Sequence, residues 1–244
     1  MKPFNLTYVR YPPDDVVGSL MAVASLVPIA GILATSGVFF ARRELWDILT
    51  LAGTLFCEVV AQILKWWAKD PRPSSCAVVD FCGTYGMPSS HAQLAAFSAT
   101  INSLHLYRRL RGCRLRGDET SITTLHLQRL DPLVIASVSS SWPVAFVVAV
   151  SRVHLGYHSF EQVCVGFAIG FGLGIVWHAA SCVIAAAAKE GLECRVVSNK
   201  NFCSVLWTKA VEFLNLRDSS LVSNPLEFQR QLFVQYAERR VVVE

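Results

Sequence analysis

Charged residues are scarce in this chain, and their scarcity limits the kind of protein it can be. Only 16% of the 244 residues are Asp, Glu, Lys or Arg, and the net charge is +4. An ordinary soluble domain carries about 25% charged residues. Apolar residues make up 53% of the chain, and the mean hydropathy is +0.41. This composition excludes a disordered chain, a collagen-like fibre and a nucleic-acid-binding tail, and it disfavours a soluble globule.

Long uncharged stretches indicate helices that cross a membrane. Residues 16–40, 132–150 and 162–188 contain no Asp, Glu, Lys or Arg, and a helix needs about 20 residues to cross a bilayer core. Residues 45–64 and 92–106 are also mostly apolar but carry some polar side chains, so we expect them to turn one side toward protein. The predicted fold is all-α: a polytopic membrane bundle of about five transmembrane helices.

Glycines recur at every fourth position of the fifth predicted helix, at Gly166, Gly170 and Gly174. Small residues at this spacing let two helix backbones approach closely within a membrane. We expect close packing inside one bundle, and dimerisation through this face is the alternative.

The distribution of Lys and Arg predicts the orientation of the bundle. Basic residues concentrate in Arg42 and Arg43, in the loop 107–131 and after the last span, which places these segments in the cytosol. The loops 65–91 and 151–161 then face the lumen or the exterior. Two cysteines, Cys76 and Cys82, share the first of these loops; its compartment permits a disulfide between them, although the sequence alone does not establish it.

The first polar cluster follows the second predicted span. Lys65 ends that span, and Arg72 stands seven residues later between Pro71 and Pro73, which favour an extended chain. Two fixed cations near a membrane surface suit a phosphate group, because Arg offers bidentate contacts and Lys a point charge. Taken alone, they are better explained as anchors to lipid headgroups, because basic residues after an apolar span usually have that role.

The second cluster, Pro88-Ser89-Ser90-His91, opens the third predicted span. A helix N-terminus with serine hydroxyls is an anion site, and His91 beside it can give or take a proton. The simpler interpretation is a helix cap.

The third cluster joins the fourth and fifth spans and contains Arg152, His158 and Gln162. His158 and Gln162 are four residues apart, so their side chains can touch on a helix. A histidine held by a neighbouring acceptor is suited to act as a nucleophile or base.

The predicted topology brings all three clusters to one side of the membrane. The set of cations, serines and histidines fits attack on a phosphate by one histidine and protonation of the leaving oxygen by the other. No cluster of carboxylates accompanies them, so we expect no metal and no other cofactor.

These motifs resemble the type 2 phosphatidic acid phosphatase (PAP2) superfamily of membrane lipid phosphatases. The signature Lys-x6-Arg-Pro, Pro-Ser-x-His and Ser-Arg-x5-His-x3-Asp is matched from Lys65 to Gln162, with Gln162 in place of the final Asp. Gln can accept a hydrogen bond from the histidine ring but brings no negative charge. The sequence around His91 and His158 is similar to that of one branch of the superfamily, the dolichyl diphosphate phosphatases. In that branch Gln is usual at the position of Gln162.

The resemblance implies a PAP2/haloperoxidase-like core and the hydrolysis of dolichyl diphosphate to dolichyl phosphate and inorganic phosphate, which recycles the lipid carrier of N-glycosylation. His158 would form a phosphohistidine, His91 would protonate the leaving oxygen and then activate water, and Gln162 would orient His158. The phosphoryl oxygens would be held by Lys65, Arg72, Ser89, Ser90 and Arg152. It also implies the endoplasmic reticulum membrane, with the active site facing the lumen.

The expected organisation is a lumenal N-terminus (1–14), a transmembrane catalytic domain (15–188) and a cytosolic amphipathic tail (189–244). The expected partners are a polyprenyl diphosphate lipid and the bilayer, without nucleic acid; nothing in the sequence identifies a protein partner. Two alternatives stay open. One is a phosphatase of another lipid phosphate, such as phosphatidic acid, a sphingoid phosphate or an isoprenyl diphosphate. The other is a non-catalytic lipid-binding protein on the same fold, for which Gln162 is the support.

Overall fold

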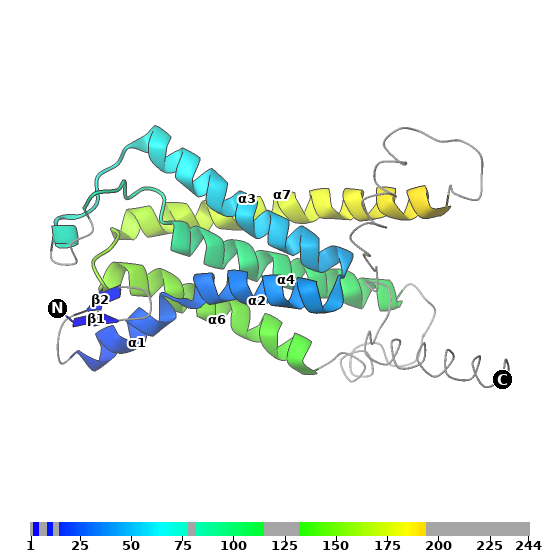
Figure 1. The fold of residues 1–244 in the computed structure, drawn as a ribbon, viewed down its shortest axis with the longest axis horizontal. Helices are drawn as coiled ribbons and strands as arrows, with labels where there is room; N and C mark the ends of the chain where they lie inside the picture. The colour runs from blue at the N-terminus through cyan, green and yellow to red at the C-terminus, as the bar shows by residue number, and fades with distance from the viewer. Residues whose placement is uncertain (1, 5–8, 12–14, 78–81, 115–131, 194–244) are drawn as a thin grey trace.

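The computed structural model describes residues 2–4, 9–11, 15–77, 82–114 and 132–193. In these ranges the chain forms a bundle of long helices with one short antiparallel hairpin at the N-terminal end (Figure 1). The elements are β1 (Lys2–Phe4), β2 (Val9–Tyr11), α1 (Val16–Ala24), α2 (Val27–Arg42), α3 (Leu45–Ala68), the 3₁₀ turn η1 (Ser74–Ala77), α4 (Ser90–Arg114), α6 (Pro132–His154) and α7 (Phe160–Glu193). The predicted helical membrane bundle is confirmed, and the hairpin is an addition that the all-α expectation did not include.

The helices match the expected spans. Among the described residues, Val16–Arg42, Leu45–Ala68 and Phe160–Ala186 are long and apolar enough to cross a membrane. The other two expected spans are also helical, since α4 has 25 residues and α6 has 23. Successive long helices run in alternating directions along the long axis of the molecule (Figure 1), as consecutive membrane crossings must.

The first span is two helices rather than one. α1 ends at Ala24 and α2 begins at Val27, with Pro28 in its first turn. Proline has no backbone N–H and its ring collides with the carbonyl four residues earlier, so it fits the first turn of a helix better than the interior. The hydroxyl of Ser25 donates to the Ala22 carbonyl, 2.7 Å away, at the end of α1. The break lets α1 turn away from α2 and pack against α6.

Helix α4 lies at the centre of the bundle, in contact with α2, α3, α6 and α7. On α7, Gly166, Gly170 and Gly174 face α4: a Cβ at Gly166 would lie 2.5 Å from the Ser89 carbonyl oxygen, and one at Gly170 would overlap the backbone of Gln93. The glycine spacing therefore serves packing inside the bundle, as predicted.

The apolar core gathers around Phe97 of α4, which is fully buried with Cys57, Leu94 and Ile101. Trp177 of α7 packs against the same cluster. The helix α7 continues to Glu193, five residues past the predicted end of the catalytic domain at 188. The predicted cytosolic tail lies, from residue 194 on, outside the described residues.

Candidate active site

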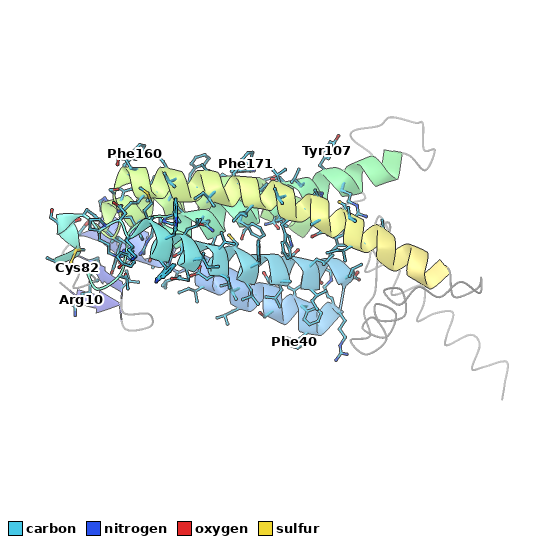
Figure 2. All side chains as sticks on the ribbon, turned by 90° about the horizontal axis from the view of Figure 1, so that it is seen from above. Arg10, Phe40, Cys82, Tyr107, Phe160 and Phe171 are labelled. Carbon is cyan, nitrogen blue, oxygen red and sulfur yellow. A yellow bond between two sulfur atoms is a disulfide. The ribbon has the colours of Figure 1, made fainter. Side chains whose placement is uncertain are left out.

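All three polar clusters meet at one end of the bundle. The end of α3, the start of α4, the end of α6 and the start of α7 lie together there, next to the β1–β2 hairpin (Figure 1). The side-chain view shows the same arrangement, with Arg10 of the hairpin, Cys82 and Phe160 at that end and Tyr107 at the other (Figure 2). Residues from Lys65 to Gln162 are therefore brought together by the alternating direction of four helices.

Arg72 is held by a fork of hydrogen bonds after α3 has ended. The chain leaves α3 at Ala68 and passes through Pro71 in a non-helical conformation, as the prolines predicted. The Arg72 Nη1 donates to the Tyr157 carbonyl at 2.6 Å, and its Nε and Nη2 donate to the Thr84 hydroxyl at 3.1 and 3.0 Å. Because the guanidinium is planar, these contacts fix its plane as well as its position.

The loop after α3 is fastened at two further points. Cys76 and Cys82 form a disulfide, with their Cα atoms 5.2 Å apart, so the pairing that the sequence left open is made. The Ser75 hydroxyl donates to the Gly156 carbonyl at 2.9 Å. Gly156 has φ +75°, a conformation that favours glycine, and a Cβ there would lie 3.0 Å from the Ser75 side chain. The 65–91 loop is thereby tied to the loop that carries His158.

His158 and Gln162 stand at the start of α7 and are almost completely buried, at 3% and 2% exposure. Ser159 precedes the helix: its hydroxyl accepts from the Gln162 N–H at 3.3 Å, and its own N–H donates to Gln162 Oε1 at 3.2 Å. This reciprocal pair is a capping box, Ser-x-x-Gln. It holds the Gln162 side chain next to His158, whose Nδ1 lies 3.3 Å from Gln162 Oε1.

The neighbours of His158 determine which ring nitrogen carries the proton. Nδ1 lies 2.9 Å from the Gly86 carbonyl oxygen and 3.3 Å from Gln162 Oε1. Both are acceptors, so Nδ1 must be the donor. Nε2 is then unprotonated and lies 3.3 Å from Nη1 of Arg72. The free electron pair of His158 therefore points toward the cation that the sequence assigned to phosphate binding.

Electrostatics keep this ring neutral. Burial is the main cause that lowers the pKa of His158, to about 3, and the positive charges of Arg152, Arg72 and Lys65 act in the same direction. The hydrogen bond with Gln162 opposes the shift. At neutral pH the imidazole is therefore uncharged, which is the form that can act as a nucleophile or base.

The remaining predicted residues lie at the same end of the bundle. Lys65 Nζ donates to the Ser90 hydroxyl at 3.1 Å. The Arg152 guanidinium lies over the Tyr157 ring, 4.3 Å from its centroid, and Arg152 is 5% exposed. Ser89 is fully buried. In the described part of the chain, the Ser89 hydroxyl and the Arg152 Nε are buried polar atoms without a hydrogen-bond partner.

His91, in the first turn of α4, interacts electrostatically with all three cations and with His158. The structure thus brings together every residue that the sequence analysis selected: Lys65, Arg72, Ser89, Ser90, His91, Arg152, His158 and Gln162. One detail differs from expectation at the start of α4, because the Ser89 N–H is already bound to the Gln162 carbonyl at 3.0 Å. The Ser89 N–H therefore links the start of α4 to α7 and is not available to bind an anion.

Sequence reasoning missed four contributors to this site. Thr84 and Tyr157 hold Arg72, and Gly86 accepts from His158. Asp70 accepts a hydrogen bond of 2.6 Å from Nε2 of Gln162. Asp70 and Gly86 stand inside or beside the motifs, and an acidic residue within a basic segment was a signal available for Asp70. The Tyr157 contact is made by a backbone carbonyl, which no residue type reveals.

Three cations, two histidines and a helix N-terminus at one end of a membrane bundle are the groups expected of a membrane enzyme that acts on a phosphate group. The PAP2 superfamily model matches residues 45–182, a span that contains every site residue. The chain belongs to the PAP2 superfamily and is a phosphatase of that family. The lipid phosphatases of the family and the membrane helices place its substrate among bilayer lipids.

Known proteins of this family are similar over most of the chain. Lipid phosphate phosphatase gamma of Arabidopsis thaliana is 33% identical over 180 residues, 72% of each chain. Dolichyldiphosphatase 1 of Homo sapiens is 30% identical over 228 residues, 93% of this chain and 86% of its own. Among solved structures, a PAP2-type phosphatidylglycerolphosphate phosphatase from Bacillus subtilis shares the fold, with a TM-score of 0.50 and 21% identity, over 72% of this chain and 80% of that one.

Proposed function

We propose that this protein hydrolyses dolichyl diphosphate to dolichyl phosphate and inorganic phosphate through a phosphohistidine on His158. The observation that carries the proposal is the state of that ring. Its Nδ1–H is bound to the Gly86 carbonyl and Gln162, and its unprotonated Nε2 faces Arg72. A neutral imidazole with Nδ1–H held by acceptors and an unprotonated Nε2 in contact with a fixed cation is suited to attack a phosphorus atom once a phosphoryl group takes over the Arg72 contact.

In the first step, Nε2 of His158 bonds to the terminal phosphorus while the bond from that phosphorus to the bridging oxygen breaks. Dolichyl phosphate leaves, and its oxygen takes a proton from His91, which enters the step protonated because the negative charge of the bound diphosphate offsets the nearby cations. In the second step, His91 takes a proton from water, whose oxygen attacks the phosphohistidine and releases inorganic phosphate and free His158. Both steps conserve charge and protons, and neither requires an oxidant, a reductant or a second substrate besides water.

Five side chains would hold the transferring phosphoryl group: Lys65, Arg72, Ser89, Ser90 and Arg152. Two of their polar atoms, the Ser89 hydroxyl and the Arg152 Nε, are buried without a partner in the described residues. A buried polar group without a partner costs about 1–3 kcal/mol, so phosphate oxygens would relieve that cost for both. Preorganised donors of this kind stabilise the charge that develops on the transferring group.

The long isoprenoid chain would lie in an apolar groove between α6 and α7. This groove has a volume of about 730 Å³, and its wall includes Trp142, Phe146, Val150, Phe160, Phe167 and Phe171. One end of the groove adjoins the site, because the lining residues Phe160 and Val163 stand two residues after His158 and one residue after Gln162. A substrate with a charged diphosphate and a long apolar chain fits this combination.

Similarity to dolichyldiphosphatase 1 over 93% of this chain supports the choice of a diphosphate. The second candidate is a phosphatase of a different lipid phosphate, which the similarity to lipid phosphate phosphatase gamma favours. We also propose the endoplasmic reticulum membrane, with the site facing the lumen. The Cys76–Cys82 disulfide supports this side, because disulfides persist in the oxidising lumen and not in the cytosol.

The test is phosphate release by the purified protein in detergent, with EDTA present. We expect release from dolichyl diphosphate with a higher kcat/KM than from phosphatidic acid, a sphingoid phosphate or farnesyl diphosphate. His158→Ala should abolish release, and brief incubation with labelled substrate should label wild-type protein at His158. His154→Ala is the matched control, since His154 ends α6 only four residues before His158 but contacts Asp15, with Nε2 3.4 Å from Oδ2. Full activity of His158→Ala would refute the mechanism, and a preference for monophosphates would favour the second candidate.

A further inference from the structure

Gln162 occupies the place of an acidic residue, and the structure shows a carboxylate directly behind it. Gln162 Nε2 donates to Asp70 Oδ2 at 2.6 Å and to the Pro71 carbonyl at 2.8 Å. On its other side, Gln162 Oε1 lies 3.3 Å from Nδ1 of His158. Asp70, Gln162 and His158 therefore form a continuous chain of hydrogen bonds, assembled from the end of α3 and the start of α7.

The orientation of the Gln162 amide is determined by backbone groups. The Ser159 N–H can only donate, and it meets Oε1 at 3.2 Å. The Pro71 carbonyl can only accept, and it meets the amide nitrogen at 2.8 Å. Reversing the amide would place nitrogen against N–H and oxygen against C=O, which neither side tolerates. The oxygen therefore faces His158 and the nitrogen faces Asp70.

Gly86 completes the arrangement. Its N–H donates to the Asp70 carbonyl at 2.8 Å, and its own carbonyl accepts from His158. A Cβ at this position would overlap the Gln162 amide. The amide can thus occupy its place between Asp70 and His158 only because residue 86 has no side chain.

We infer that Asp70 is a positioning residue that acts through Gln162 on His158, supplying the negative charge that Gln162 itself lacks. The inference rests on the proposed function of His158. When Nε2 bonds to phosphorus, the ring keeps its Nδ1 proton and acquires positive charge. A carboxylate at the far end of the amide stabilises that charge and holds the ring in its reactive tautomer. Asp70 contacts neither substrate nor the reacting atoms.

The test separates charge from shape. In Asp70→Asn the new amide oxygen can still accept from Gln162, so only the charge is lost; Asp70→Ala loses both. We expect Asp70→Asn to lower kcat on the order of ten- to a hundredfold with KM within about twofold, and Asp70→Ala to lower it further. Asp70→Glu, which keeps the charge, should retain more activity than Asp70→Asn.

A charge-relocation variant makes the test independent of simple structural damage. Gln162→Asp alone sets two carboxylates beside each other and should lower kcat. The double variant Asp70→Asn/Gln162→Asp has one carboxylate again, now next to His158, and should be more active than either single variant. A merely structural role for Asp70 predicts instead that the two losses multiply.

Two results would overturn the inference: wild-type kcat in Asp70→Asn, or a double variant no better than the product of its parents. Either leaves the proposed function intact if wild-type protein still releases phosphate and becomes labelled at His158. Absence of both from the wild type would refute the function itself. Thermal unfolding in detergent identifies any variant that fails to fold. Among the variants that fold, the kcat of the double variant relative to the two single variants still tests the inference.

Discussion

The Nη1 of Arg72 lies 3.3 Å from Nε2 of His158 and, at the same time, 2.6 Å from the Tyr157 carbonyl oxygen. Nη1 of Arg72 thus contacts both His158, the proposed nucleophile, and the backbone carbonyl of the residue before it. The Thr84 hydroxyl holds the other side of the guanidinium. The cation is therefore placed before any substrate arrives, which is the arrangement expected for stabilising charge in a transition state.

Replacing Arg72 with Lys should lower kcat/KM for phosphate release on the order of a hundredfold. Lysine keeps the charge but offers no planar fork to bind Tyr157, Thr84 and a phosphoryl group together. Steady-state phosphate release measures the loss. Lys69→Arg, in the same segment and exposed, is the control and should match the wild type. Unchanged kinetics in Arg72→Lys would show that charge alone suffices.

The lowered pKa of His158 predicts how stability changes with pH. In the folded protein this ring stays neutral down to about pH 3, whereas in the unfolded chain it takes up a proton near pH 6.5. Between these values the unfolded state binds more protons, so stability falls as the pH is lowered from 6.5 toward 3. The fall in Tm from pH 7.5 to pH 5 should be smaller in His158→Gln than in the wild type. Parallel falls would contradict the burial of a neutral ring.

Substituting Gly86 with Ala should damage activity more than stability. The added Cβ overlaps the end of the Gln162 side chain, which can rotate away, so the fold survives. Once displaced, the amide no longer holds His158 or meets Asp70. We expect kcat to fall at least about tenfold while Tm changes little. A large drop in Tm with proportional loss of activity would argue for a purely structural glycine.

Two glycines of α7 offer a matched test of helix packing. At Gly170 a Cβ would overlap the backbone of Gln93 in α4, whereas at Gly172 nothing lies within 4 Å in the described structure. Backbone cannot move aside as a side chain can, so Gly170→Ala should destabilise the bundle by about 1–3 kcal/mol. Gly172→Ala should leave stability unchanged or slightly raised. Denaturation in detergent measures both, and equal effects would contradict close α4–α7 packing.

Filling the groove between α6 and α7 should affect long substrates selectively. Ala168 lines the groove and is exposed, so Ala168→Trp occupies space proposed for the isoprenoid chain. We expect a higher KM for dolichyl diphosphate and little change for farnesyl diphosphate, whose chain is short. Val176→Trp, on an exposed position of the same helix outside the groove, is the control. Equal effects on both substrates would remove the groove from the proposal.

Much of this structure follows from local features of the sequence. Uncharged stretches predicted the helices, because a membrane span depends on its own composition. Residue type and spacing selected Lys65, Arg72, His91 and His158 as candidate site residues, and the structure places them near one another. The break between α1 and α2 was not predicted, although Pro28 was visible, because membrane helices often tolerate an internal proline.

The contacts that complete the site depend on distant parts of the chain. The Asp70–Gln162 hydrogen bond joins residues 92 positions apart. The sequence alone therefore did not show that a carboxylate lies next to Gln162. Likewise, the contributions of Gly86 and Tyr157 are made by backbone carbonyls, which every residue possesses. Only their placement by packed helices distinguishes them from other carbonyls.

The assembly of the site from four helix ends has a consequence for biosynthesis. Arg72 is made early, yet its histidine partner follows 86 residues later, and the capping box that holds Gln162 forms only when α7 begins. A nascent chain that has inserted α1 to α6 therefore carries the cations without the nucleophile. If His158 is the nucleophile, we expect activity to appear only after α7 has been inserted, and products truncated before α7 to release no phosphate.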